Sequence, residues 1–160
     1  MKTDNFIFEK IDLSKDTHII CKDELINSKG SELVLKDINN FINRNIELGI
    51  IDKITATYII NYKNKNIGLA FVNFHPEIER DGKILEEEIE IGLGLISKYR
   101  GMHLGRLIEK ELCEELLKKY PRFDYIVARI DNNNISINSA LKSGFELYND
   151  DEYHYKKYKY

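Results

Sequence analysis

The stretch that decides the fold of this chain reads SKYRGMHLGR and covers residues 97–106. It joins an alternating apolar segment to a long helical pattern that begins near Met102. The first turn of a helix exposes unpaired N–H groups and about half a positive charge. No Asp or Glu occurs between residues 92 and 108, whereas Lys98, Arg100 and Arg106 surround the helix start. This electropositive start favours a bound anion, such as a phosphate.

Two glycines in the same stretch are compatible with close approach of a ligand. Gly101 and Gly105 remove side chains where backbone would have to contact it. A plain surface turn that needs glycine for its geometry explains this stretch equally well. A Walker loop is excluded because no GKS or GKT follows, and the dinucleotide fingerprint GxGxxG is absent.

The segments before this stretch predict strands. A strand is expected near residues 5–12 and a helix near residues 35–48, and residues 54–61 and 67–75 form a hairpin around a polar turn. Residues 86–95 alternate strictly, so their side chains fall on two faces of a strand. One face carries Glu87, Ile89, Ile91, Leu93 and Leu95, and the other carries Glu86, Glu88, Glu90, Gly92 and Gly94.

The segments after it alternate between helix and strand. The helix from Met102 ends near Lys119, and a buried strand follows at residues 125–130. Asn133 or Asn134 caps a short helix that Gly144 closes, and residues 145–148 and 153–158 form a last hairpin. A strand–helix–strand unit requires a parallel crossover. We therefore expect an α/β (α+β) fold with a mixed, mostly antiparallel central sheet and flanking helices.

Composition narrows the class of protein. The 160 residues show no repeat or linker, which predicts a single domain over residues 1–160. The net charge of −3 does not suggest nucleic-acid binding. No apolar run or signal-like start is present, so we expect a cytoplasmic protein without membrane contact. The two cysteines lack metal-ligand spacing, which predicts no metal, and Cys113 lies on an apolar helix stripe as a buried, inert thiol.

Two motifs resemble those of the GNAT superfamily of acyl-coenzyme A N-acyltransferases. Residues 100–105, RGMHLG, resemble its R/Q-x-x-G-x-G/A loop, with His103 at the first motif glycine. A helical His103 would cost little, because only its backbone N–H is required. Residues 133–136 and 141–145, NNIS and LKSGF, resemble its N-x-x-S…K-x-G-F stretch. The likeness covers about residues 88–146.

This resemblance implies a GNAT-like N-acetyltransferase fold with acetyl-CoA as cosubstrate and no metal. The pantetheine arm would pair with the strand backbone at Leu93 and Leu95, where Gly92 and Gly94 leave room, although those glycines also suit a bulge. Asn133 would contact the same arm, or simply cap the helix, and Ser136 and Asn138 are further candidates. Backbone N–H groups for the pyrophosphate would come from Arg100, Gly101, Met102, His103, Leu104 and Gly105.

The resemblance also implies a base for an amine acceptor. An alkylammonium group must lose a proton before it can attack, and a carboxylate can accept that proton. Glu90 matches the family's base position and Glu88 is the second candidate, whereas a solvated acidic edge is the plainer interpretation. His75, at a strand end, is a further candidate to assist.

The chain departs from the family at the position of the general acid. Many relatives carry a tyrosine there, but this chain has Ala140. The acid is therefore absent, unnecessary, or supplied elsewhere; the nearby tyrosines are Tyr148, Tyr153 and Tyr155. Ala128 likewise offers no carboxylate on the following strand.

Three hypotheses follow. The first is an N-acetyltransferase that moves an acetyl group from acetyl-CoA to a primary amine of a small molecule or protein by direct attack on the thioester. The second is a non-catalytic acyl-CoA-binding regulatory module. The third is a general nucleotide-binding α/β domain. A homodimer could form through an exposed, tyrosine-rich C-terminal strand.

Overall fold

A mixed sheet of seven strands organises the described part of the chain, in the order β1-β2-β3-β4-β5-β7-β6. The structure is a computed structural model that describes residues 1–11, 55–80, 82–95, 97–132 and 134–157. Every neighbouring pair of strands is antiparallel except β4 and β5, which are parallel. The strands are β1 (Phe6–Ile11), β2 (Thr55–Tyr62), β3 (Lys65–Arg80), β4 (Lys83–Leu95), β5 (Tyr125–Arg129), β6 (Glu146–Asn149) and β7 (Glu152–Lys156). The expected mixed α/β fold is confirmed; the helix expected near residues 35–48 lies outside the described residues.

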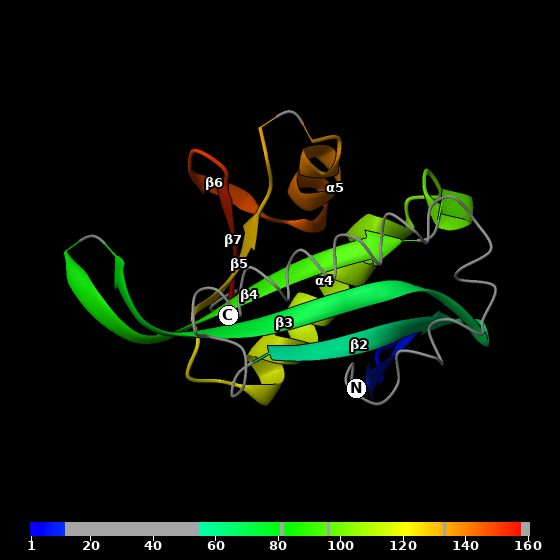
Figure 1. Ribbon diagram of the computed structural model, residues 1–160, viewed down its shortest axis with the longest axis horizontal. Helices are drawn as coiled ribbons and strands as arrows, with labels where there is room; N and C mark the ends of the chain where they lie inside the picture. The colour runs from blue at the N-terminus through cyan, green and yellow to red at the C-terminus, as the bar shows by residue number, and fades with distance from the viewer. Residues whose placement is uncertain (12–54, 81, 96, 133, 158–160) are drawn as a thin grey trace.

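The hairpin of β3 and β4 is longer than the sequence predicts and extends past the other strands (Figure 1). The expected end of β3 near His75 is wrong, because the strand continues to Arg80. Pro76 lies opposite Glu87, beyond Asn73, which is the last β3 residue with a described partner on β2. Proline is tolerated in a strand where its missing N–H faces no neighbour.

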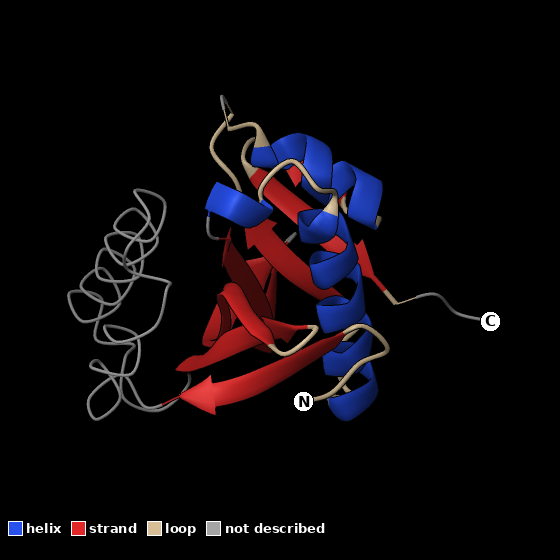
Figure 2. Cartoon of the chain, turned by 90° about the vertical axis from the view of Figure 1, so that its right-hand side faces the viewer, coloured by secondary structure: helices blue, strands red, loops and turns tan. Residues whose placement is uncertain are grey.

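One long helix covers one face of the sheet (Figure 2). Helix α4 (Leu104–Lys119) packs its stripe of Ile108, Leu112, Cys113 and Leu116 into the core, together with Ile89 and Ile126 from the sheet. Alternation along β4 therefore turns Ile89 and Ile91 toward α4, and Glu88 and Glu90 toward the opposite face. None of the described helices is long and apolar enough to cross a membrane.

Helix α5 (Ser136–Ser143) packs against α4 and ends at Gly144, whose φ is 113°. The side-chain oxygen of Asn134 accepts a hydrogen bond from the N–H of Ser136 at 2.9 Å. The N-cap position itself is held by Ile135, which makes no side-chain cap hydrogen bond, so the expected N-cap at Asn134 is wrong by one residue. The closing hairpin is also confirmed, but its last strand is not an exposed edge. β7 lies between β5 and β6, with Tyr153 and Tyr155 buried. The basis for a homodimer through this strand is therefore wrong.

Candidate functional site

The only parallel pair of described strands separates shortly after it forms. β4 and β5 are paired at Ile89–Ile126 and at Glu90–Val127, and no pairing follows. Figure 1 shows the two strands diverging beyond this point. The backbone of residues 92–95 consequently has β3 on one side, at positions Gly68 to Phe71, and no strand partner among the described residues on the β5 side. A parallel strand edge left open in this way can pair with an extended ligand.

A cleft of about 1070 Å³ occupies this opening. It runs from the residues that precede α4, between β4 and β5, to the beginning of α5. Ten of the thirteen residues predicted for the site line this cleft. Those that line it are Glu90, Leu93, Leu95, Arg100, Gly101, His103, Leu104, Gly105, Ser136 and Asn138.

Three predicted residues are not in the lining. Glu88 is buried, with 1% of its surface exposed. Met102 is 56% exposed and does not line the cleft. Asn133 lies outside the described residues. The two motifs nevertheless meet across one opening, although more than 25 residues of chain separate Gly105 from Ser136.

The loop before α4 contains two left-handed residues. A short 3₁₀ turn covers Ser97–Tyr99, and Gly101 follows with a φ of 74°. His103 has a φ of 60° and caps α4, which begins one residue later. The condition under which His103 would cost little, a helical conformation, is therefore not met. The family's glycine at this position would adopt this conformation freely, whereas His103 adopts it at a cost of about 1–2 kcal/mol.

The start of α4 is electropositive, as the sequence predicts. No acidic residue occurs in its first turn, and Arg100, His103 and Arg106 all line the cleft. The Nε of Arg100 donates a hydrogen bond to the carbonyl oxygen of Leu95 at 2.9 Å. This contact ties the loop to the end of β4, so the open strand edge and the helix start form the walls of one cleft.

Glycines on both walls allow neighbouring side chains to pack closely. A Cβ added at Gly105 would lie 3.0 Å from Ser139 Oγ, and one added at Gly92 would lie 3.0 Å from Phe71 Cδ2. Both positions would be crowded by any larger residue. The exposed strand backbone and the basic helix start fit an extended ligand that carries a phosphate group.

Glu90 lies where the strands begin to separate, and its carboxylate is paired with Arg129. The Nη1 of Arg129 donates to Glu90 Oε2 at 2.7 Å, and Nη2 donates to Glu88 Oε1 at 3.3 Å. Tyr125 donates its hydroxyl proton to the other oxygen of Glu88 at 3.1 Å. Glu88 and Glu90 are thus held inside a polar network, which argues against a simple solvated edge at these two residues.

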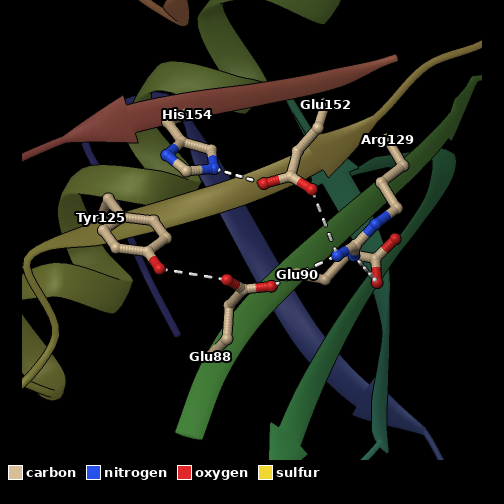
Figure 3. A network of polar contacts seen from close by, with 6 residues as sticks. All are labelled: Glu88, Glu90, Tyr125, Arg129, Glu152 and His154. Carbon is tan, nitrogen blue, oxygen red and sulfur yellow. Dashed lines mark hydrogen bonds and ion pairs between the residues drawn. The ribbon is translucent and has the colours of Figure 1, made fainter. Parts of the chain in front are cut away.

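The network continues onto β7 (Figure 3). Arg129 Nη2 lies 3.5 Å from Glu152 Oε2, and His154 Nε2 lies 2.5 Å from Glu152 Oε1. The His154 ring is stacked between Tyr125 and Tyr148, with ring centroids 4.4 and 4.2 Å away. Sequence analysis missed Arg129, Glu152 and His154. Their signal was alternation: Tyr125 and Arg129 fall on one face of β5, beside the acidic face of the parallel strand β4.

No tyrosine near Ala140 in sequence reaches the cleft. Ala140 itself is fully buried, and the hydroxyl of Tyr155 donates to Glu114 at 3.3 Å. Tyr148, Tyr153 and Tyr155 are absent from the lining, whereas Tyr99 is present. The side chain of His75 lies outside the described part of the structure.

One buried acid lines the cleft between the two helices. Glu109 Oε2 accepts hydrogen bonds from Ser139 Oγ at 3.2 Å and from Ser143 Oγ at 2.5 Å. Burial raises the pKa of Glu109, while the two serine hydrogen bonds partly offset this rise. Burial also raises the pKa of the Cys113 thiol well above its usual value. Cys113 is completely buried, so its predicted burial is confirmed, whereas its inertness stays a prediction. The described residues contain no group of His, Cys, Asp or Glu arranged to hold a metal ion.

Comparison with solved structures shows that the fold is that of the GNAT acetyltransferases. The aminoglycoside acetyltransferase AAC(6')-Ib in complex with ribostamycin and coenzyme A matches with a TM-score of 0.64 and 16% identity, over 96% of this chain and 94% of that one. A putative GnaT-family acetyltransferase from Bordetella pertussis matches with a TM-score of 0.58 and 18% identity, over 96% and 95%.

A third similar structure is the KacTA–DNA complex, with a TM-score of 0.64 and 12% identity over 94% of this chain and 92% of that one. Because this similar structure contains DNA, the expectation that nucleic acid is excluded as a partner remains unsupported. No model of a known protein family and no curated protein sequence matches the chain.

Proposed function

We propose that this chain is an acetyl-CoA-dependent N-acetyltransferase whose acceptor is a primary amine of a small molecule or a protein. The observation that carries the proposal is the cleft between the separating strands β4 and β5, which joins the basic helix start to Glu90. Its fold neighbours include AAC(6')-Ib, a structure that holds coenzyme A and an aminoglycoside.

The two motifs divide the binding of acetyl-CoA between them. Backbone N–H groups of residues 100–105, beside Arg100 and Arg106, would hold the phosphates at the start of α4. The open backbone at Leu93 and Leu95 would pair with the pantetheine arm, and Ser136 and Asn138 line the opposite wall. When bound, acetyl-CoA supplies an acetyl group already activated as a thioester.

Glu90 is the proposed general base. Its carboxylate is the acidic group of β4 that both lines the cleft and belongs to the polar network, whereas Glu88 is buried below it. Glu90 would take one proton from the acceptor's ammonium group, directly or through a water molecule, and leave a neutral amine able to attack. Glu88, Glu90 and Glu152 all contact the guanidinium of Arg129, so three negative charges surround one positive charge. This excess of negative charge favours a cationic acceptor.

Calorimetry of acetyl-CoA binding tests the cofactor site. We expect the wild type to bind acetyl-CoA in the micromolar range and Gly105→Glu to lose binding, because the new carboxylate occupies the cleft and repels phosphate. Leu147→Glu adds the same charge at an exposed position on β6 and should bind normally. Thermal unfolding of each variant shows whether it is folded. A wild type that does not bind acetyl-CoA would refute the proposal.

An acceptor screen tests the chemistry. Polyamines, aminoglycosides, amino acids and peptides with free N-termini or lysines would be incubated with acetyl-CoA, and acetylated products detected by mass spectrometry. We expect transfer to at least one class of amine. Tight binding of acetyl-CoA without transfer to any of them would favour the regulatory module instead.

A further inference from the structure

Arg129 occupies the centre of a charged cluster built by three strands (Figure 3). Its guanidinium contacts Glu90 at 2.7 Å and Glu88 at 3.3 Å, both on β4, and Glu152 at 3.5 Å on β7. Arg129 itself is the last residue of β5. The cluster therefore joins the strands on either side of the point where the cleft opens.

The three carboxylates that Arg129 contacts are largely removed from water. The side chain of Glu88 is 0% exposed, that of Glu152 is 11% exposed and that of Glu90 is 16% exposed. Charges removed from water are costly unless they are paired with good geometry. Arg129 contacts all three acids, so its loss would remove a positive charge that Glu88, Glu90 and Glu152 share.

The β7 side of the cluster has further contacts that do not involve Arg129. Glu152 contacts His154 Nε2 at 2.5 Å, and the imidazole is stacked between Tyr125 and Tyr148 with interplanar angles of 7° and 8°. Tyr125 also donates to Glu88. Glu88 and Glu152 are both fixed by groups other than Arg129, and they in turn fix the guanidinium nitrogen Nη2 that faces them. Nη1 is then directed at Glu90.

We propose that Arg129 is a positioning residue that holds the Glu90 carboxylate at the mouth of the split between β4 and β5. This inference rests on the proposed function, in which Glu90 accepts the proton of the acceptor amine. The planar guanidinium serves two sides at once, with one nitrogen for Glu90 and the other for Glu88 and Glu152. An ammonium group is a point charge without this fork, so a lysine would keep the charge and lose the alignment.

The test compares Arg129→Lys and Arg129→Ala with the wild type, with Arg122→Lys as the matched control. Arg122 stacks over Phe123 at 4.7 Å and is not part of the cleft lining. For Arg129→Lys we expect the affinity for acetyl-CoA to stay within about twofold and kcat to fall by roughly tenfold or more, as expected for a displaced catalytic group. Arg122→Lys should keep the kcat of the wild type.

Chemical rescue separates positioning from a purely structural role. In Arg129→Ala, guanidinium chloride at roughly 20–50 mM, well below denaturing concentrations, should restore kcat several-fold by filling the vacated place. Ammonium chloride at the same concentration should not. If Arg129→Ala does not fold, the kcat of Arg129→Lys relative to its unchanged cofactor affinity decides the matter.

The outcomes distinguish the two proposals. A wild type that acetylates no amine would refute both. A wild type that is active while Arg129→Lys keeps full kcat would overturn only the role of Arg129. Loss of kcat in step with a lowered melting temperature and weaker acetyl-CoA binding, without rescue by guanidinium, would make Arg129 a structural residue and would also overturn the inference.

Discussion

The two halves of β4 differ although they belong to one continuous strand. At Ile89 and Glu90 the strand pairs with both β3 and β5, and the side chains of Glu88 and Glu90 enter a network with β5 and β7. From Gly92 to Leu95 it has lost β5, and its backbone borders a cleft. The first half can hold charged groups in place, and the second can accept a ligand. Variants of the first half should therefore change turnover, and variants of the second should change cofactor affinity.

The largest expected effect is on turnover, at Glu90, where β4 is paired with both β3 and β5. Glu90→Gln should lower kcat by about 10²–10⁴-fold, because the amide cannot accept the proton, while acetyl-CoA binding stays unchanged. Steady-state kinetics with an identified amine and calorimetry of cofactor binding measure the two quantities. Glu146→Gln, at an exposed glutamate on β6, is the control and should keep its kcat. Full activity of Glu90→Gln would remove the base from the proposal.

A smaller effect, on cofactor affinity and not on turnover, is expected at the loop that follows the open segment of β4. Arg100→Gln should weaken acetyl-CoA binding by roughly tenfold, the value of one charge-assisted contact, and leave kcat at saturation unchanged. The loss should shrink as salt is added, because exposed charges are screened. Calorimetry at low and high ionic strength measures both. Arg122→Gln is the matched control. Unaltered affinity in Arg100→Gln would show that the loop does not contact phosphate.

The stability of the protein should depend on pH through Glu109, the buried acid between α4 and α5. The raised pKa of Glu109 means that its charged form is disfavoured in the folded protein, so its contribution to stability is greatest when protonated and is lost as pH rises through the folded pKa. Glu109→Gln cannot ionise, so we expect it to be more stable than the wild type at pH 8, by about 1 kcal/mol, the usual scale for one buried hydrogen-bonded group.

Thermal unfolding of both proteins between pH 4 and pH 8 measures this difference. It should close as pH falls, since Glu109 of the wild type then becomes protonated. A difference that is constant across the pH range would mean that the substitution acts through packing alone.

The smallest effects concern the two left-handed residues of the loop, and they should have opposite signs. His103→Gly should stabilise the fold by about 0.5–1 kcal/mol because glycine adopts a positive φ freely. Gly101→Ala should destabilise it by a similar amount of about 1 kcal/mol, although a Cβ there meets no atom within 4 Å. Chemical denaturation measures both. Equal shifts of the same sign would contradict the left-handed geometry.

Local pattern was sufficient for much of the fold. The alternation in residues 86–95 correctly separated Glu88 and Glu90 from Ile89 and Ile91, because side chains of a strand alternate whatever surrounds it. The absence of acidic residues before α4 and the closing role of Gly144 were likewise local properties. Each depended on a few consecutive residues, so no tertiary information was needed.

Other features depended on which strands become neighbours. The length of β3 was underestimated because Pro76 was interpreted as an element boundary, whereas it lies within the strand, opposite Glu87 of β4. The last strand was expected at an edge, but β7 inserts between β5 and β6. His103 would cost little in a helical conformation, but α4 starts at Leu104 and leaves it in the turn.

The sequence by itself determined the element types, the two faces of β4 and the electropositive start of α4, because these follow from short-range periodicity and charge. Only the tertiary structure decided that β4 and β5 separate after Glu90 and that Arg129 lies among three carboxylates. The physical reason is register. Alternation along a strand sets which of its side chains share a face, whereas pairing between segments far apart in the chain sets which residues lie beside them.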